Sequence, residues 1–346
     1  MARVITNKGS ILITTLWIVS ILAVMAVGIG FRVSVETRLS KYYAESQKAL
    51  YLAKAGVIKS QYLLSSSKKD YDYVYECGID YSEDNNPEQI FGYDMNIMES
   101  GSFSVYYELF PDSDEPLKVY GVADEERKIN INADKLAKGN IGEYRRMLSV
   151  LDADITEDII DAIIDWQDTD ETTTGFGGAE SFYYESLPKP YSSKNEDYEI
   201  IHELLLVKGV SRELYEKLKN YLTVYGDGKV NINTASMKVV NAVIGDGKGT
   251  YGGLLNSIAE YKAGADGIFG TADDRIFLKP EDLQSVATDN MEKNRISQVM
   301  PYIKVKSDVF MIRAHGVSGK TTKTIECIYT RGQAESGPAV LFYNQD

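Results

Sequence analysis

With 346 residues, 44% of them hydrophobic, the chain can bury a core in one large domain or in two ordinary ones. Its 51 acidic and 37 basic residues give a formal net charge of −14, which argues against nucleic acid as a partner. Two histidines, His202 and His315, are too few for most metal or hydrolytic chemistry, and two cysteines, Cys77 and Cys327, allow one long-range disulfide or remain two buried thiols.

The first predicted element is a membrane-spanning helix. The run from Ser10 to Phe31 carries no charge, and at about 1.5 Å per residue it crosses a bilayer core of about 30 Å. Arg3 and Lys8 precede this run, so the positive-inside rule places the N-terminus in the cytoplasm and the chain after Arg32 in the periplasm. Because no small-residue cleavage site follows, we expect the inner membrane to retain the helix as a single-pass anchor.

The same helix is predicted to continue beyond the membrane. An alternating spacing of four and three residues lines one helical face, a pattern typical of a surface that packs on a core. The residues of this stripe are Leu39, Tyr43, Ser46, Leu50, Ala53, Val57, Ser60 and Leu64. Joined to the apolar run, the stripe predicts one helix over residues 10–64.

A short basic leader ending in Gly9, an apolar run and an amphipathic continuation resemble the N-terminus of type IV pilin-like proteins. The resemblance implies that prepilin peptidase removes residues 1–9, so that Ser10 becomes the first mature residue. In that family the fifth mature residue is usually a glutamate, which neutralises the terminal ammonium of a neighbouring subunit in the apolar filament core. Here it is Thr14, and the K-type minor pseudopilins of type II secretion systems are similar in lacking the glutamate and in the run around Trp17.

Strands are predicted on both sides of the remaining chain. Alternating β-branched and aromatic residues mark residues 102–110 and 118–132 as strands. Near the C-terminus, residues 308–316 and 323–331 flank a Val-Ser-Gly-Lys turn and predict a hairpin.

The region between these strands is predicted to be helical. In ITEDIIDAIIDW, five isoleucines fall on one helical face. The phrase KININ from Lys128 recurs as KVNIN from Lys229, each a short strand whose Asn or Thr could cap the next helix, which indicates an internal duplication. The expected fold is α+β, a long N-terminal helix packed on a pilin-like antiparallel sheet with a large inserted α-helical domain. The expected boundaries are 1–9 for the leader, 10–64 for the helix, 65–132 for the first part of the sheet domain, 133–300 for the insertion, 301–332 for the last strands and 333–346 for a tail.

The K-type pseudopilins have this plan, and phrases along nearly the whole chain resemble theirs: VADEERKININ, IIDAIIDWQDTD, GAESFYY, ELLLVKGVSRELYEKL and TVYGDGKVNINTAS. The resemblance implies a non-catalytic subunit at the tip of the pseudopilus that supports protein export across the outer membrane. Its partners would be the I- and J-type minor pseudopilins, the major pseudopilin, prepilin peptidase and the inner membrane. A minor pilin of a type IV pilus and a membrane-tethered periplasmic enzyme remain the alternatives.

Carboxylates gather on and just past the end of one predicted helix, namely Asp161, Asp165, Asp168, Asp170 and Glu171. The helix dipole disfavours each by roughly 0.3–1 kcal/mol at this end, which a bound cation would offset. Carboxylates and carbonyls suit Ca²⁺, and Glu180 could return after a glycine loop to complete the shell. K-type heads bind calcium, so the resemblance implies calcium as a structural cofactor, whereas a solvated acidic loop is the alternative. The expected ligands are Asp165, Asp168, Asp170 and Glu180.

A second oxygen-rich loop reads GADGIFGTADD from Gly264. Its Asp266, Asp273 and Asp274 could converge on another calcium ion, although plain turns also require glycine and aspartate. Paired carboxylates could also serve acid–base catalysis, but their clustering suits a cation better.

The segment 202–218 resembles a helix-hairpin-helix motif, which elsewhere binds DNA phosphates. Ser211 replaces its second glycine, and the chain is acidic. We therefore expect a structural hairpin in which His202 is a packing residue.

Overall fold

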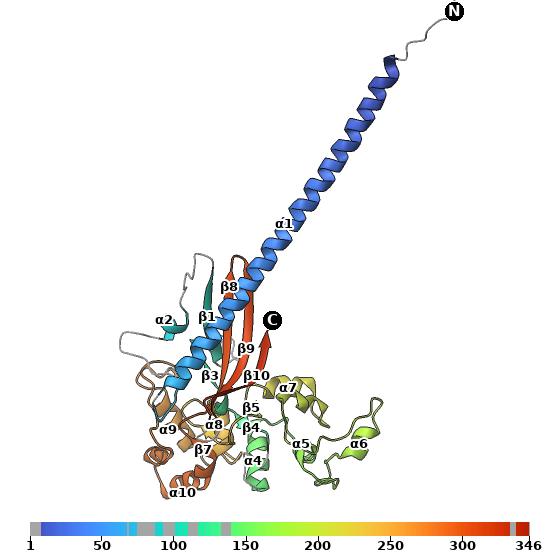
Figure 1. The fold of residues 1–346 in the computed structure, drawn as a ribbon. Coiled ribbons are helices and arrows are strands. Elements are labelled where there is room, and N and C mark those ends of the chain that lie inside the picture. Colours follow the sequence, from blue (N-terminus) through green and yellow to red (C-terminus); the bar gives the residue numbers. More distant parts are fainter. Residues whose placement is uncertain are drawn as a thin grey trace, which may run out of the picture.

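The computed structural model describes residues 8–67, 69–74, 87–92, 101–109, 117–132, 140–332 and 337–345. A long helix lies on a sheet, and a helical domain lies at the end of the sheet farthest from the N-terminus (Figure 1). This arrangement confirms the predicted α+β fold.

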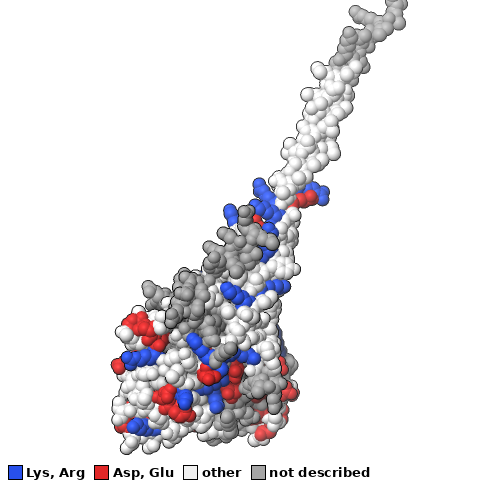
Figure 2. Space-filling view, turned by 60° about the vertical axis from the view of Figure 1, so that its left-hand side comes forward, with Lys and Arg blue, Asp and Glu red and all other residues white. Residues whose placement is uncertain are grey.

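Helix α1 (Lys8–Ser66) contains 59 residues and is therefore about 90 Å long. From Ile11 to Phe31 it is apolar, exposed and uncharged (Figure 2), and it is long and apolar enough to cross a membrane. Its second half packs on the sheet, where Ala53, Val57 and Leu64 are buried. The predicted stripe is confirmed only in this second half, because α1 rises past the edge of the sheet and leaves Leu39 50% exposed. Tyr43 is exposed for the same reason.

The sheet is antiparallel, in the order β10-β9-β8-β1-β2, with the short β3 also paired to β8. Its strands are β1 (Ser102–Leu109), β2 (Leu117–Tyr120), β3 (Ala123–Asp124), β8 (Val309–Ser318), β9 (Thr321–Thr330) and β10 (Ala339–Gln345). The predicted C-terminal hairpin is confirmed, since Ser318 pairs with Thr321 around Gly319, whose φ is +58°. The segment expected as a tail contains the edge strand β10, whose Val340 and Phe342 pair with β9.

The segment 118–132 does not form one strand. After β3, Asp124 accepts a hydrogen bond from the amide of Glu126 at 2.8 Å and begins a 3₁₀ turn, η2 (Glu125–Arg127). The chain then enters β4 (Ile129–Asn130), which belongs to the helical domain. A short-range cap therefore overrides the alternating pattern.

Cys327 lies in the core between α1 and the sheet as a free, fully buried thiol, and burial raises its pKa to about 11. Around it pack Ala53 and Val57 of α1 and Phe103 and Ile312 of the sheet. Cys77 lies outside the described residues.

Gly316 of β8 lets α1 approach the sheet, because a Cβ there would overlap the backbone oxygen of Ala49. We expect Gly316→Ala to lower the free energy of unfolding by about 1–3 kcal/mol, since neither backbone can yield without shifting α1. Denaturant unfolding of the full chain in detergent measures this loss. Gly253→Ala, where the new Cβ meets only a Glu292 oxygen at 3.5 Å, is the control and should be near neutral. Equal behaviour of the two variants would contradict the close packing.

The helical domain consists of two halves with matching elements. The first half contains β4, α4 (Ile141–Leu151), α5 (Glu157–Gln167), α6 (Ser181–Glu185), η3 (Ile201–Leu206), α7 (Arg212–Leu218) and β5 (Leu222–Thr223). The second contains β6 (Val230–Asn231), α8 (Met237–Ile244), α9 (Gly252–Lys262), η4 (Pro280–Val286), α10 (Asn290–Val299) and β7 (Ile303–Lys304). Strand β4 pairs in parallel with β5, and β6 pairs in parallel with β7. The shared core extends from Ile129 to Val305, slightly beyond the expected boundaries of the insertion.

The repeated asparagines have the same role in both halves, but they do not cap helices. The side-chain amide of Asn132 donates to the carbonyl of Tyr198 and accepts from its amide. Asn233 does the same with Phe277. The duplication predicted from KININ and KVNIN therefore has a structural counterpart, and Ser236 is the cap of α8.

Candidate metal centre

The acidic cluster lies where α5 ends and the chain turns back to α6. Thr156 caps α5 at its start, and Asp168 is its C-terminal cap. Asp165 stands in the last turn of α5, whereas Glu180 occupies the N-cap position of α6. Gly178 lets the returning loop pass close to Asp165, because a Cβ there would overlap the Asp165 carboxylate.

The loop brings Asp165, Asp168 and Glu180 together, so that one carboxylate oxygen from each lies within 4.8 Å of the others. Asp165 and Glu180 are almost fully buried. Asp165 Oδ2, Asp168 Oδ1 and Glu180 Oε1 are buried without a hydrogen-bond partner. Three unsatisfied anionic oxygens at one point are costly unless a cation or protons neutralise them.

The electrostatics of the cluster agree with this geometry. Burial, followed by repulsion from Asp170 and Asp165, raises the pKa of Asp168 to about 6. Burial, followed by repulsion from Asp165 and Asp168, raises the pKa of Glu180 to about 7. Without a cation, the cluster therefore holds protons at pH values where ordinary carboxylates are ionised.

These raised pKa values predict a pH dependence of the calcium-free chain. Below neutral pH the folded state binds more protons than the unfolded state, so the free energy of unfolding should fall as the pH rises from about 4 to about 7. Thermal unfolding in chelator at about pH 5 and about pH 7 would measure the fall. The double variant Asp168→Asn, Glu180→Gln, which removes both titrations, should flatten it. An equally steep dependence in this variant would contradict the assignment.

The fourth expected ligand, Asp170, and two other carboxylates of the acidic run are not part of this group of three. Asp170 is exposed and accepts a hydrogen bond from the amide of Thr172 at 2.7 Å. Glu171 accepts from the Ser181 hydroxyl at 3.0 Å, and Asp161 forms an ion pair with Arg145. Three of the four expected ligands are therefore together, and Asp170 acts on them through repulsion.

Asn195 is a polar residue beside the site that residue spacing did not indicate, and its side-chain amide donates to Glu171 at 2.9 Å. Its backbone amide donates to the carbonyl of Trp166 at 3.0 Å, and its Oδ1 is buried without a partner. Its backbone has a φ of +53°, a conformation that asparagine tolerates better than most residues. Because Asn195 follows Glu180 by fifteen positions, only the folded loop places it against the end of α5.

The set of donors fits calcium. Carboxylate oxygens are hard ligands, and Ca²⁺ takes six to eight oxygens from side chains, carbonyls and water. Lys208 donates to the carbonyls of Gly177 and Gly178 at 2.9 and 3.2 Å and so fixes the glycine loop. The calcium predicted from the sequence remains a proposal for this site.

The second oxygen-rich loop follows α9, in the position that the first loop has after α5. Asp273 accepts from the amides of Ala265 and Asp266 at 2.8 and 3.0 Å, and Thr271 Oγ1 lies within 3.0 Å of both Asp266 and Asp273. Asp274 accepts from the amide of Gly270 at 2.8 Å. These bonds account for the shape of the loop without an ion, so calcium at Asp266, Asp273 and Asp274 stays a prediction.

Comparisons with known proteins match the part of the chain that contains the first loop. The family model described as "Type II secretion system (T2SS), protein K" matches residues 126–227. The chain is 29% identical over 212 residues to type II secretion system protein K of Aeromonas hydrophila, covering 60% of this chain and 61% of that protein. It is 28% identical over 129 residues to the protein K of Pseudomonas aeruginosa, covering 35% of this chain and 38% of that protein. Residues 126–227 are therefore similar to the type II secretion system protein K family.

The protein K match to Aeromonas hydrophila spans about three fifths of that relative's length. A solved structure adds support for the fold. A chain of the GspK-GspI-GspJ complex from the enterotoxigenic Escherichia coli type 2 secretion system has a TM-score of 0.61 over 90% of this chain and 99% of its own length, at 16% identity. The fold predicted from the sequence is confirmed, and these relatives agree with the family that the sequence resembles.

The helix-hairpin-helix segment forms η3 and α7. Ser211 caps α7 by accepting from the amide of Leu214 at 3.1 Å, and Gly209 turns the chain with a φ of +82°. The ring of His202 lies 5.4 Å from that of Tyr215. Both residues act in local packing and capping, as expected.

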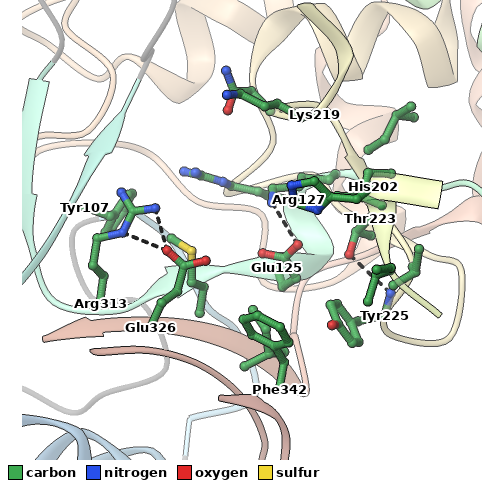
Figure 3. A pocket seen from close by; sticks show the side chains of 18 of the residues that line it. Tyr107, Glu125, Arg127, His202, Lys219, Thr223, Tyr225, Arg313, Glu326 and Phe342 are labelled. Atoms are coloured by element: carbon green, nitrogen blue, oxygen red, sulfur yellow. Dashed lines mark hydrogen bonds and ion pairs between the residues drawn. The ribbon is translucent and has the colours of Figure 1, made fainter. Parts of the chain in front are cut away.

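A groove of about 720 Å³ separates this segment from the sheet (Figure 3). Arg313 pairs with Glu326 at 2.7 Å on its floor, and Lys128 pairs with Glu125 at 2.8 Å. The guanidinium of Arg127 lies 5.0 Å from the centre of the Tyr107 ring. The groove is lined by residues of both the sheet and the helical domain, and two of its ion pairs form within it. It is therefore a polar boundary between these two parts.

Proposed function

We propose that this chain is a minor pseudopilin at the tip of the type II secretion pseudopilus, where it supports protein export by assembling with I- and J-type minor pseudopilins and the major pseudopilin. Before assembly the protein is anchored in the inner membrane with its head in the periplasm. Its role is interaction and not catalysis.

The arrangement of α1 and the head is the observation that carries this proposal. The exposed apolar half of α1 suits a membrane first and a filament core later, and one face of its other half is already covered by the sheet from Ala49 onwards. The helical domain lies beyond the C-terminal end of α1 (Figure 1). Such a bulky domain is hard to repeat along a tightly packed shaft and fits best at an end.

Thr14 supports a position at the tip. Its hydroxyl donates to the carbonyl of Ile11 at 2.9 Å, so its polar group is satisfied within α1. A subunit with another subunit above it needs a carboxylate near this position to neutralise the neighbour's terminal ammonium. The uppermost subunit has no such neighbour.

Processing tests the pilin-like part of the proposal. Co-expression with prepilin peptidase should give a mature chain that begins at Ser10, as read by N-terminal sequencing. Gly9→Leu should block the cleavage, whereas Ser10→Ala is the matched control next to the scissile bond. A mature chain that retains Gly9 would contradict the proposal.

Assembly tests the functional part. The mature head should co-purify with the I- and J-type subunits of the same organism, and a strain without this chain should accumulate secretion substrates in the periplasm. Normal secretion in that strain would contradict the function, even if processing occurs.

The proposal includes calcium as a structural cofactor held by Asp165, Asp168 and Glu180. A bound calcium ion would supply the positive charge that lets these three carboxylates remain ionised together. The chain itself closes the loop through Gly178 and fixes it through Lys208. A loop fixed in this way would hold α6 against α5, where Tyr184 packs edge-to-face on Trp166.

A further inference from the structure

Basic side chains gather at the end of the head from which the apolar half of α1 emerges. We name this group the basic collar. It consists of Arg32, Arg38, Lys41 and Lys48 of α1 and Lys320 and Lys323 of the β8–β9 hairpin. Residues 32–48 and 319–323, which carry the collar, contain two acidic residues, Glu36 and Glu45, so the collar is positive in a chain of net charge −14. Figure 2 shows the blue side chains on α1 directly after its uncharged stretch.

Two elements that are far apart in sequence form the collar. The tip of the β8–β9 hairpin reaches α1 at Glu45, because a Cβ on Gly319 would lie 2.7 Å from the Glu45 carboxylate. This contact places the exposed Lys320 beside the helix. The collar is therefore a property of the fold and not only of the helix sequence.

Most collar charges are available to a partner. Arg32 and Glu36 lie 2.9 Å apart, but their side chains are 82% and 62% exposed, so this pair is weak. Lys41 is 3.7 Å from Glu45. Arg38, Lys48, Lys320 and Lys323 have no ion pair within the described parts of the chain.

The spacing along α1 matches a membrane surface. Arg32 directly follows the apolar run, and Arg38 and Lys41 lie about 10–15 Å farther along the axis. The headgroup layer is about 5–8 Å thick, and long basic side chains extend toward it. The hairpin lysines lie near Glu45, about 20 Å from Phe31 and therefore about 12–15 Å beyond the headgroup layer. This gap exceeds the Debye length of about 8 Å at physiological salt, so these lysines add attraction mainly at low salt.

The positive charge of the collar is unusual for the side of the membrane on which the head is expected to lie. The positive-inside rule disfavours basic residues next to the span on the translocated side. An acidic head is repelled by an anionic surface, and the collar is the part of the described surface beside the span that offsets this repulsion. An acidic protein partner could use the same charges, but the direct continuity with the apolar span favours lipid.

We propose that the basic collar binds the anionic phospholipid headgroups of the leaflet nearest the head and holds the β8–β9 hairpin toward that leaflet before assembly. This inference rests on the membrane anchoring in the proposed function. Each basic group near an anionic surface strengthens binding by roughly five-fold, and the effect falls with salt.

The test uses the full chain in nanodiscs of phosphatidylcholine with a minor fraction of phosphatidylglycerol. Spin-labelled phosphatidylglycerol should associate with the protein severalfold more than spin-labelled phosphatidylcholine at low salt, and the preference should vanish at about 1 M salt. The triple variant Arg32→Gln, Arg38→Gln, Lys41→Gln, which removes the three basic groups closest to the span, should bring the ratio close to one. Its control is Lys189→Gln, Lys279→Gln, Lys293→Gln, with the same change of charge on exposed lysines of the helical domain.

A second measurement follows the hairpin. Amide hydrogen exchange at Gly319 and Lys320 should be slower in the anionic nanodiscs than in pure phosphatidylcholine, and this difference should vanish in the collar variant but not in the control. An inserted chain without any preference for phosphatidylglycerol, or a collar variant that keeps it, would overturn the collar and leave the anchor intact. A chain that enters neither nanodisc would overturn the anchor as well. If the parent chain showed no lipid preference and the collar variant lost binding to the I- and J-type subunits, the collar would be a protein interface and not a lipid site.

Discussion

Removal of calcium by a chelator is expected to lower the melting temperature of the full chain in detergent by about 5–10 °C. A ligand present at about 100 times its dissociation constant stabilises the folded state by about 2.7 kcal/mol, and each kcal/mol shifts the melting temperature by about 2–4 °C in a domain of this size. Asp165 and Glu180 are buried with unsatisfied oxygens, so the calcium-free cluster takes up protons in place of the ion. Near-UV circular dichroism with and without chelator measures the shift.

Asp168→Asn separates a metal ligand from a merely acidic residue. The variant should lose the calcium response, yet in chelator it should melt no lower than the parent, because one repelling carboxylate is gone. Asp170→Asn is the matched control, with the same change of charge two residues away on an exposed side chain. It should keep the response. If both variants lost the calcium response equally, Asp170 would be a ligand as well, and its placement outside the site would be wrong.

The sequence predicted the elements whose pattern is local and strong. The apolar run and the stripe gave α1, and the alternating strands around Gly319 gave the C-terminal hairpin. The family could be inferred because several phrases occur in order, whereas the fifth mature position, Thr14, is informative only within that family. The stripe failed at Leu39 because periodicity shows which face is apolar but not where the partner surface ends.

The candidate site was predictable as chemistry but not as geometry. The residue spacing placed Asp165 and Asp168 at the end of one helix, but it also predicted Asp170 as a ligand. Glu180 joins them through a loop whose path depends on Gly178 packing against Asp165, and Asn195 reaches the site from farther along the chain. Contacts of this kind depend on tertiary packing, which a single sequence does not encode in its local pattern.

The junction between the sheet and the helical domain was not predictable from its residues, because its charges are buried. Glu126 is 2% exposed and lies in the segment expected to be a strand. Its Oε1 is 2.6 Å from Lys304 Nζ, and its Oε2 accepts from the amide of Asp308 at 2.6 Å. Lys304 also pairs with Asp227 at 3.0 Å. These contacts join η2, β7 and the start of β8.

Lys304→Met is expected to lower the free energy of unfolding by about 3–5 kcal/mol, because it leaves Glu126 buried without its cation. Burial raises the pKa of Glu126 above its usual value, although the attraction of Lys304 partly opposes this rise. Without Lys304 this pKa should rise further, so the variant's folded state binds a proton that the unfolded state lacks near neutral pH. The loss should therefore be larger at about pH 8 than at about pH 5. Denaturant unfolding at both pH values measures it.

The double variant Glu126→Gln, Lys304→Met isolates the pair. Because it removes the stranded charge, it should be more stable than Lys304→Met alone by more than about 1 kcal/mol, and its loss should not change between the two pH values. Lys217→Met is the matched control, since Lys217 pairs with Asp154 at 2.6 Å but both side chains are more than half exposed. Its cost should stay below about 1 kcal/mol. Equal losses for Lys304→Met and Lys217→Met would mean that the junction does not depend on the buried pair, and that the two domains are held together by their apolar contacts alone.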